Sequence, residues 1–193
     1  MDEEGKLYSP SVGGALRQGE VLSDLIQARV VPGRAIGDTH VDLVTHPFAV
    51  VLSQDCDLDL DFLASNEPEA VKNPSEKKLP NVLFCEAVTA TEMRGRLADG
   101  QVWRQITQNK NERYQYLRGA TPETDALALG FPDLGLDFKR YFTVPTPEVY
   151  SQLQGSAKRR SRLHSPYVEH LCSRFAFYLA RVALPEEHLA RKL

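Results

Sequence analysis

The sequence predicts an α+β fold that is mainly β and carries one amphipathic helix docked at its C-terminal end. Two continuous apolar runs, at residues 48–52 and 82–85, have the length and the β-branched content of buried strands. Apolar residues after position 165 recur at three- and four-residue spacings, which is typical of a helix packed on a core. The 193 residues are expected to form one β-rich domain over residues 18–193, preceded by an irregular arm over residues 1–17.

The first half of the chain has the pattern of strands separated by turns. Residues 19–22 lead into a short strand, and residues 29–31 form a second apolar piece that the dipeptide Pro32-Gly33 ends. The clearest strand spans residues 46–53. Residues 64–80 are polar, contain three prolines and are expected to form an exposed loop or a short irregular helix.

The second half continues with strands and ends in a helix. Strands are predicted at residues 81–88, 111–117 and 136–144, and a short helix at residues 91–98. The final helix is predicted over about residues 165–183, with Ser165 as N-cap and Pro166 at the first helical position. Its apolar stripe consists of Val168, Leu171, Cys172, Phe175, Leu179 and Val182. We expect Phe175 and Leu179 to be buried against the sheet.

Composition indicates a cytoplasmic protein without a membrane segment. No apolar run approaches the roughly 20 residues of a transmembrane helix, and the acidic N-terminal tetrapeptide MDEE lacks the basic and apolar regions of a signal peptide. The three cysteines, Cys56, Cys85 and Cys172, are an odd number without a CxxC pair, which favours free thiols in a reducing compartment. No motif indicates a cofactor, and none is expected.

The most unusual segment is residues 54–61, in which aspartates occupy every second position. On a continuing strand their carboxylates would share one face about 7 Å apart, where a hard cation or a basic partner would relieve their repulsion. Gln54, Asp55 and Asp57 are therefore candidate binding residues. If a metal ion binds, the candidate ligands are Asp55, Asp57 and Asp59, although a calcium loop does not fit the spacing and no metal is expected.

The preferred interpretation of these aspartates is structural. A solvated acidic face on an edge strand discourages aggregation. We expect Asp55 or Asp57 to accept backbone hydrogen bonds from the following turn and to pair with an arginine of the C-terminal half. The arginines expected for this pairing are Arg140, Arg174 and Arg181.

Cys56 is the candidate nucleophile, because it follows a strand, where loops often present reactive groups. Its neighbours Asp55 and Asp57 argue against activation, since negative charge raises the pKa of a thiol. A catalytic cysteine also needs a base, and no spacing selects one of the histidines. A structural thiol is therefore the preferred interpretation.

Basic residues cluster immediately before the final helix. Lys158, Arg159, Arg160 and Arg162 are candidate binding residues for the phosphates of RNA or DNA. The preferred interpretation is a solvated charged linker, which is the usual role of a basic run. The formal net charge of −3 argues against a nucleic-acid footprint over the whole surface.

Two resemblances to known families bear on fold and function. Residues 18–90, with a G-E-V-L strand at 19–22 and P-F-A-V-V-L-S at 47–53, resemble the PemK-type toxin barrel, although His46 stands where that family has arginine. This resemblance implies a small, partly closed antiparallel barrel. The S-Q-D-C-D-L segment at 53–58 and the Y-V-E-H-L-C-S-R-F-A segment at 167–176 resemble a group of uncharacterised bacterial or phage-associated proteins. That resemblance hints at an accessory role in defence against phage or mobile elements.

Two functions follow from these observations. The first is a non-enzymatic binding or adaptor protein of a bacterial or phage genome, whose partner is another protein; it is preferred because no complete catalytic motif is present. The second is a toxin-type endoribonuclease, or another enzyme acting on nucleic acid, built on the small barrel. A groove in residues 18–90 with convergent Arg, Lys or His side chains would favour the second.

Overall fold

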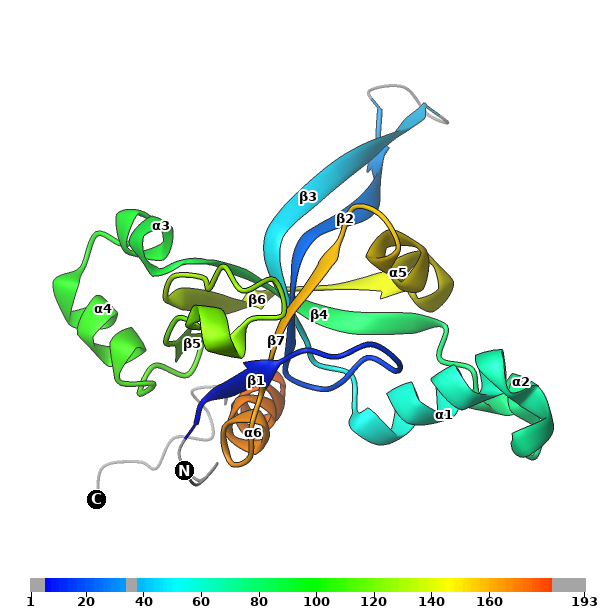
Figure 1. Ribbon diagram of the computed structural model, residues 1–193. Coiled ribbons are helices and arrows are strands. Elements are labelled where there is room, and N and C mark those ends of the chain that lie inside the picture. Colours follow the sequence, from blue (N-terminus) through cyan, green and yellow to red (C-terminus); the bar gives the residue numbers. More distant parts are fainter. Residues whose placement is uncertain (1–5, 34–37, 182–193) are drawn as a thin grey trace, which may run out of the picture.

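The structure is a computed structural model that describes residues 6–33 and 38–181. Within these residues, seven antiparallel strands form one sheet in the order β1-β7-β2-β3-β4-β6-β5 (Figure 1). The strands are β1 (Tyr8–Pro10), β2 (Glu20–Pro32), β3 (Thr39–Val51), β4 (Asn81–Thr89), β5 (Tyr114–Leu117), β6 (Leu134–Pro145) and β7 (Lys158–Leu163). The helices are α1 (Asp55–Asn66), η1 (Pro68–Ala70), α2 (Pro74–Lys77), α3 (Ala90–Gly95), α4 (Gly100–Thr107), η2 (Pro122–Thr124), α5 (Thr146–Leu153) and α6 (Tyr167–Leu179).

The predicted α+β class with an antiparallel sheet is confirmed. The sheet is not closed, because β1 and β5 form its two ends. The helices α1 and α2 lie beyond one end of the molecule, and α3 and α4 lie beyond the opposite end (Figure 1).

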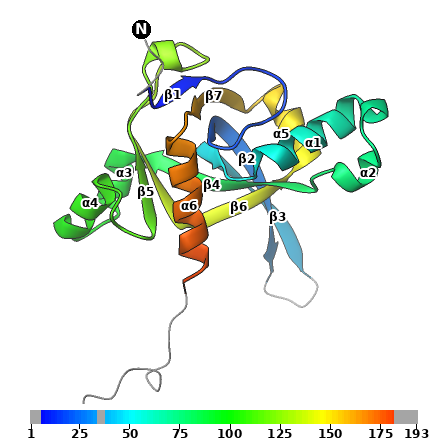
Figure 2. The ribbon, with the colours of Figure 1, turned by 90° about the horizontal axis from the view of Figure 1, so that it is seen from below.

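Both faces of the central strands are buried, which explains why their apolar runs are continuous rather than alternating. In β3, Val50 belongs to one core cluster, whereas Ala49 and Val51 belong to the other. The first cluster is covered by α6, which lies against the sheet near β5 and β6 (Figure 2). Phe175 of α6 packs edge-on against Phe138 of β6. The second cluster is covered by α1 and α5.

The strands predicted at residues 46–53, 81–88 and 136–144 are confirmed as parts of β3, β4 and β6. The prediction of two short strands between residues 19 and 31 is wrong, because β2 is a single strand of 13 residues. Its register with β3 continues unchanged from Val21 to Pro32.

The N-terminal segment is more regular than the sequence suggests. Tyr8–Pro10 forms β1 and pairs with β7, so that Tyr8 lies opposite Leu163. Leu16 is completely buried. The described part of the predicted arm therefore belongs to the same packed unit as the sheet.

The aspartate-rich segment continues β3 as a helix and not as a strand. Helix α1 begins at Asp55, and its N-cap Gln54 is extended. Asp55 and Asp57 occupy the first turn, where carboxylates complement the positive end of the helix dipole. The expectation of four aspartates on one strand face is therefore wrong.

The basic segment, expected to be a linker, is the strand β7 between β1 and β2. Residues 64–80, expected as a loop or an irregular helix, contain the end of α1 together with η1 and α2. The short helix predicted at residues 91–98 is confirmed as α3.

The C-terminal helix is confirmed but shorter than predicted. Helix α6 spans Tyr167–Leu179, and Pro166 rather than Ser165 is its N-cap. Leu171 and Phe175 are buried as expected. The prediction that Leu179 is buried is wrong, because 53% of its surface is exposed. Val182 lies outside the described residues.

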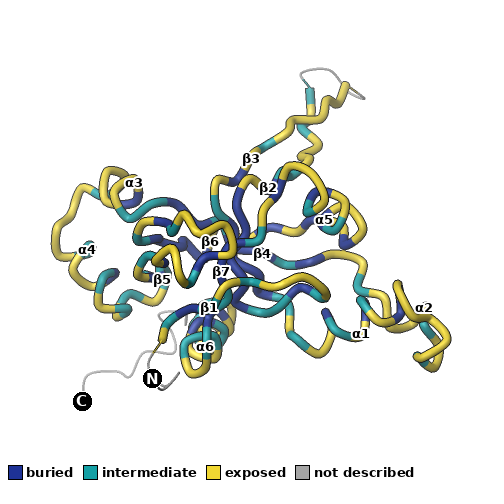
Figure 3. Tube along the Cα trace, viewed as in Figure 1, coloured by how far each residue is buried: buried dark blue, intermediate teal, exposed yellow. Residues whose placement is uncertain are grey.

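One feature extends beyond the packed body. Residues 25–32 of β2 and residues 39–46 of β3 form a two-stranded ladder that projects from the sheet, and we call it the protruding hairpin (Figure 1). Its outer part is almost entirely exposed (Figure 3). Only its innermost pair, Leu25 and His46, is buried.

Candidate functional site

One face of the protruding hairpin is apolar. Ala28 lies opposite Leu43 and Val30 lies opposite Val41, so that these four side chains share one face of the ladder, here called the apolar face. Val30, Val41 and Leu43 have 73%, 61% and 70% of their surface exposed. Scattered exposed apolar side chains are common, but a contiguous exposed set marks an interaction surface.

The opposite face of the hairpin, here called the polar face, carries the charged side chains together with two partly exposed valines, Val31 and Val44. Arg29 lies opposite Asp42, and His40 lies opposite Val31. Arg29 Nε donates to Gln27 Oε1 at 2.7 Å, and His40 Nε2 lies 3.5 Å from Asp42 Oδ1. The charged groups of this face are hydrated in water, whereas removal of the apolar face from water lowers the free energy.

A groove of about 500 Å³ lies at the base of the hairpin. Ala28 and Leu43 line it from the hairpin, Val144 and Pro145 from the end of β6, and Glu148 from α5. Because Ala28 and Leu43 also belong to the apolar face, the groove and this face form one continuous surface. Its volume lies within the range of about 300–1,000 Å³ that is usual for ligand pockets.

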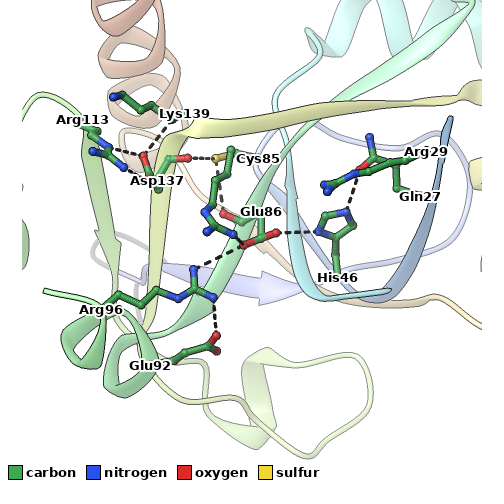
Figure 4. A network of polar contacts seen from close by, with 11 residues as sticks. Gln27, Arg29, His46, Cys85, Glu86, Glu92, Arg96, Arg113, Asp137 and Lys139 are labelled. Atoms are coloured by element: carbon green, nitrogen blue, oxygen red, sulfur yellow. Dashed lines mark hydrogen bonds and ion pairs between the residues drawn. The ribbon is translucent and has the colours of Figure 1, made fainter. Parts of the chain in front are cut away.

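A polar network at the base of the hairpin joins β3 to β4 (Figure 4). His46 is only 1% exposed, and its Nδ1 lies 3.2 Å from Glu86 Oε2. Its Nε2 lies 3.3 Å from Gln27 Oε1, and its ring stacks on Phe142 with the centroids 3.9 Å apart. Since the ring is buried, stacks on Phe142 and lies between Glu86 and Gln27, His46 is placed to anchor the hairpin rather than to act as a base on an external substrate.

Glu86 is the centre of this network. Arg140 Nη1 donates to Glu86 Oε1 at 2.8 Å, and Arg96 Nη1 lies 3.8 Å from the same oxygen. The contacts with His46 and Arg140 lower the pKa of Glu86 to about 2, although burial alone would raise it. The carboxylate is therefore charged at neutral pH.

Three arginines of the network face a small pocket of about 170 Å³. They are Arg96, Arg113 and Arg140. Arg113 holds Asp137 with two hydrogen bonds, of which the one from Nε to Oδ1 is 2.7 Å long. Its guanidinium also lies 4.8 Å from the ring centroid of Tyr114. Each guanidinium group is also paired with a carboxylate: Arg113 with Asp137, Arg140 with Glu86, and Arg96 with Glu86 and Glu92. Their remaining donors, beside an aromatic ring, are suited to a phosphate or another anion.

The structure separates the candidate residues of the acidic segment. Asp55 accepts from Gln18 N at 2.7 Å and from Arg162 Nη2 at 2.9 Å. Asp59 forms an ion pair with Arg17. Gln54 and Asp57 are exposed at the start of α1. A shared metal site is not formed: within residues 6–33 and 38–181, no group of three or more His, Cys, Asp or Glu residues is arranged to hold an ion.

The prediction that Asp55 or Asp57 pairs with Arg140, Arg174 or Arg181 is wrong. Arg140 pairs with Glu86, Arg174 donates to backbone carbonyls, among them Tyr114 O, and Arg181 donates to Tyr178 O. The pairing of Asp55 with the C-terminal half exists, but its partner is Arg162 of β7.

All three cysteines are free thiols. Cys56 is exposed in the first turn of α1, where its Sγ lies 3.6 Å from Gln54 Oε1 and 3.8 Å from Asp57 Oδ1. Cys85 is buried in β4, and burial raises the pKa of its thiol. Burial likewise raises the pKa of Cys172 to about 11. The two contacts of Cys56 are an amide and a carboxylate, and neither is the histidine base or the cationic neighbour that usually activates a thiol.

The candidate basic residues are held by internal contacts. Arg159 pairs with the buried Glu20 at 2.8 Å. Arg160 donates to both carboxylate oxygens of Asp125, at 2.9 and 2.7 Å. Lys158 Nζ donates to Gly155 O, and Arg162 pairs with Asp55. The acidic and basic candidates thus meet once, at Asp55 and Arg162.

In the described part of the chain, no helix is long and apolar enough to cross a membrane. Comparison with protein-family models, with curated proteins and with solved structures finds no match. The two family resemblances therefore stay predictions.

Sequence reasoning missed the protruding hairpin and the network around Glu86. A signal for the hairpin exists, because Pro32-Gly33 marks a turn and apolar residues alternate on both sides of it. No local signal joins His46 to Glu86, since the two residues are 40 positions apart and meet only through the pairing of β3 with β4.

Proposed function

We propose that this chain is a non-enzymatic binding or adaptor protein that docks another protein on its protruding hairpin. The observation that carries the proposal is the apolar face, whose valines and leucine are more than half exposed although residues of this type belong in cores. No described element of the chain covers them. Their burial by a partner would contribute about 25 cal/mol for each Å² of apolar surface covered.

The groove supports the same proposal. It is bordered by β2 and β6, two strands that are not neighbours in the sheet. The part of the sheet from β2 to β6 is, in this proposal, a partly closed barrel whose opening is the groove. A partner that covers the apolar face would also reach into this opening.

The test is a comparison of two matched substitutions. Leu43→Asp places a charge on the apolar face, and Leu129→Asp places the same charge on an equally exposed leucine elsewhere, since the two side chains are 70% and 73% exposed. Both variants should keep the wild-type melting temperature, because exposed substitutions change stability by roughly 0.5 kcal/mol or less. A protein that copurifies with the wild type and with Leu129→Asp, but not with Leu43→Asp, supports docking on the hairpin.

Two results would contradict the proposal. One is recovery of the same partner by both variants in equal amounts. The other is loss of the partner from both, which would indicate a general effect of added charge.

A second candidate function is contact with nucleic acid, and the arginine pocket favours it. Residues 90–118 contain six basic and three acidic residues, a net charge of +3, whereas residues 55–78 contain three basic and seven acidic residues, a net charge of −4. These segments lie at opposite ends of the molecule (Figure 1). The arginine pocket lies at the basic end, where Arg96 and Arg113 line it.

The affinity for a fluorescent single-stranded RNA tests this candidate. Binding should weaken as salt rises, because phosphate contacts release counterions. Arg96→Ala should weaken it, whereas Lys72→Ala at the acidic end should not. An affinity that neither salt nor Arg96→Ala changes would contradict it.

A further inference from the structure

The outer half of β2 has a free edge beside the groove. On this side β7 pairs with β2 only as far as Ser23, whereas β3 pairs with the other side as far as Pro32. In the described part of the chain no other strand pairs with β2. Residues of β2 beyond Ser23 therefore have one side on which backbone groups meet no strand.

The backbone groups on that edge can be identified from one side chain. Gln152 of α5 accepts a hydrogen bond from Ile26 N at 2.8 Å and donates one to Ile26 O at 2.9 Å. The N–H and C=O of Ile26 therefore point away from β3. Because these directions alternate along an antiparallel strand, the N–H and C=O groups of Ala28 and Val30 point to the same free edge.

This edge has two defined ends. The amide of Gln152 makes with Ile26 the two hydrogen bonds that a neighbouring strand would make, so it closes the inner end. Pro32 has no N–H and limits pairing at the outer end. Between these ends, Ala28 and Val30 offer two donors and two acceptors, which is the pattern that an added strand uses.

We propose that the protruding hairpin binds an extended segment of a partner chain, which pairs with Ala28 and Val30 as an additional strand and places apolar side chains in the groove. The inference rests on the proposed function and names the form of the partner. A strand presents side chains to alternate faces, so that every second residue would enter the groove next to Ala28 and Val144.

The size of the apolar face argues against a dimer formed by stacking two hairpins. Two strands about 4.8 Å apart and seven residues long cover an area of roughly 200 Å². A stable interface needs about 800 Å² on each partner. Strand addition gains affinity from backbone hydrogen bonds and from the groove, and therefore needs less flat area.

The carboxylate of Glu148 in the groove favours a basic residue in the bound segment. Glu148 lines the groove, and its Oε1 accepts from Gln152 Nε2 at 3.0 Å. A lysine or arginine of the bound segment would complement this carboxylate, whereas an acidic residue would be repelled. The expected ligand is thus an extended, alternating apolar segment with one basic residue.

The probe for this inference is the capped peptide KTVTVT, in which the lysine and both valines point to one face of the strand, observed through the backbone amides of the full chain by NMR. At a peptide concentration of about ten times Kd, the amide protons of Ala28 and Val30 should exchange roughly tenfold more slowly. The peptide ETVTVT, whose glutamate would share the groove with Glu148, should bind more weakly. A peptide with alternate N-methylated amides should not bind, since it cannot pair as a strand.

Two matched variants locate the edge. Val30→Pro removes one donor from the free edge of β2, and Val41→Pro removes one from the edge of β3 in the same residue pair. Binding of KTVTVT should be lost in Val30→Pro and kept in Val41→Pro. Unchanged amide spectra away from the hairpin establish that both variants fold.

Three results would overturn the inference. The first is equal binding of the N-methylated peptide, and the second is protection of the Val41 amide in place of the Val30 amide. The third is no change of any hairpin amide at about 1 mM peptide, a concentration at which a Kd of about 1 mM would give half-saturation. None of these results contradicts the proposed function. A partner that is lost only from Leu43→Asp still docks on the hairpin, whether or not it adds a strand. Loss of strand addition and loss of docking are therefore distinguishable.

Discussion

Arg160→Met is expected to destabilise the fold strongly. Arg160 belongs to the basic run that the sequence predicts to be solvated, but in the structure its side chain is buried. Both Arg160 and Asp125 are less than 10% exposed, and two hydrogen bonds of 2.9 and 2.7 Å join them. Burial would raise the pKa of Asp125, but the Arg160 guanidinium outweighs this and lowers it. Removal of Arg160 leaves a buried charge without a partner, which costs about 3–5 kcal/mol.

The matched control comes from the same strand. Arg162→Met breaks the ion pair with Asp55, whose side chains are 38% and 39% exposed. Exposed pairs contribute about 1 kcal/mol or less, because water and salt screen them. The two variants therefore separate an internal role of the basic run from a role as surface charge.

Thermal unfolding followed by circular dichroism measures both losses. Arg160→Met should lower the melting temperature by roughly 6–20 °C, from about 2–4 °C per kcal/mol for a chain of this size. The double variant Arg160→Met with Asp125→Leu should recover part of the loss, since no unpaired charge remains. Equal, small losses in Arg160→Met and Arg162→Met would refute the reasoning.

Three further predictions concern other parts of the molecule. The pKa of Glu86, about 2 against an ordinary 4.5, means that its charge stabilises the fold above pH 4.5 and loses this effect as pH falls toward 2. Between about pH 6 and about pH 3 the wild type should therefore lose roughly 2 kcal/mol more in urea unfolding than Glu86→Gln, and parallel losses would contradict this. Phe175→Ala should lower the free energy of unfolding by about 3–5 kcal/mol, whereas Leu179→Ala should lower it by less than about 1 kcal/mol. A much larger fall of the urea midpoint in Phe175→Ala than in Leu179→Ala would indicate that α6 docks through Phe175. Cys56 should react with a thiol reagent in the folded protein and Cys85 only on unfolding, so that equal rates would contradict the buried position of Cys85.

Sequence patterns predicted those elements whose cause is local. The strands β3 and β4 follow from apolar runs that fill both faces of a sheet, and α6 follows from the spacing of Leu171 and Phe175. The pattern was misleading at α1. Aspartates at every second position suggested a strand, but the buried residues Leu58, Asp61 and Ala64 follow a helical spacing that a buried aspartate conceals.

The functional surfaces depend on contacts that no local pattern records. Arg159 meets Glu20 from 139 positions away, so that a basic run in the sequence becomes a set of internal ion pairs in the fold. The apolar face shows the opposite change. Val30 and Val41 have the residue type of a core, and only the projection of the hairpin beyond the body leaves them exposed.

The most direct test of docking on the hairpin is site-specific photocrosslinking in cells that contain the natural partner. A photoreactive residue at position 41 lies on the apolar face, and one at position 42 lies on the polar face of the same strand. Docking on the apolar face predicts a discrete adduct with one other protein from position 41 and little or none from position 42. Equal yields from the two positions, or no adduct from position 41, would contradict the account.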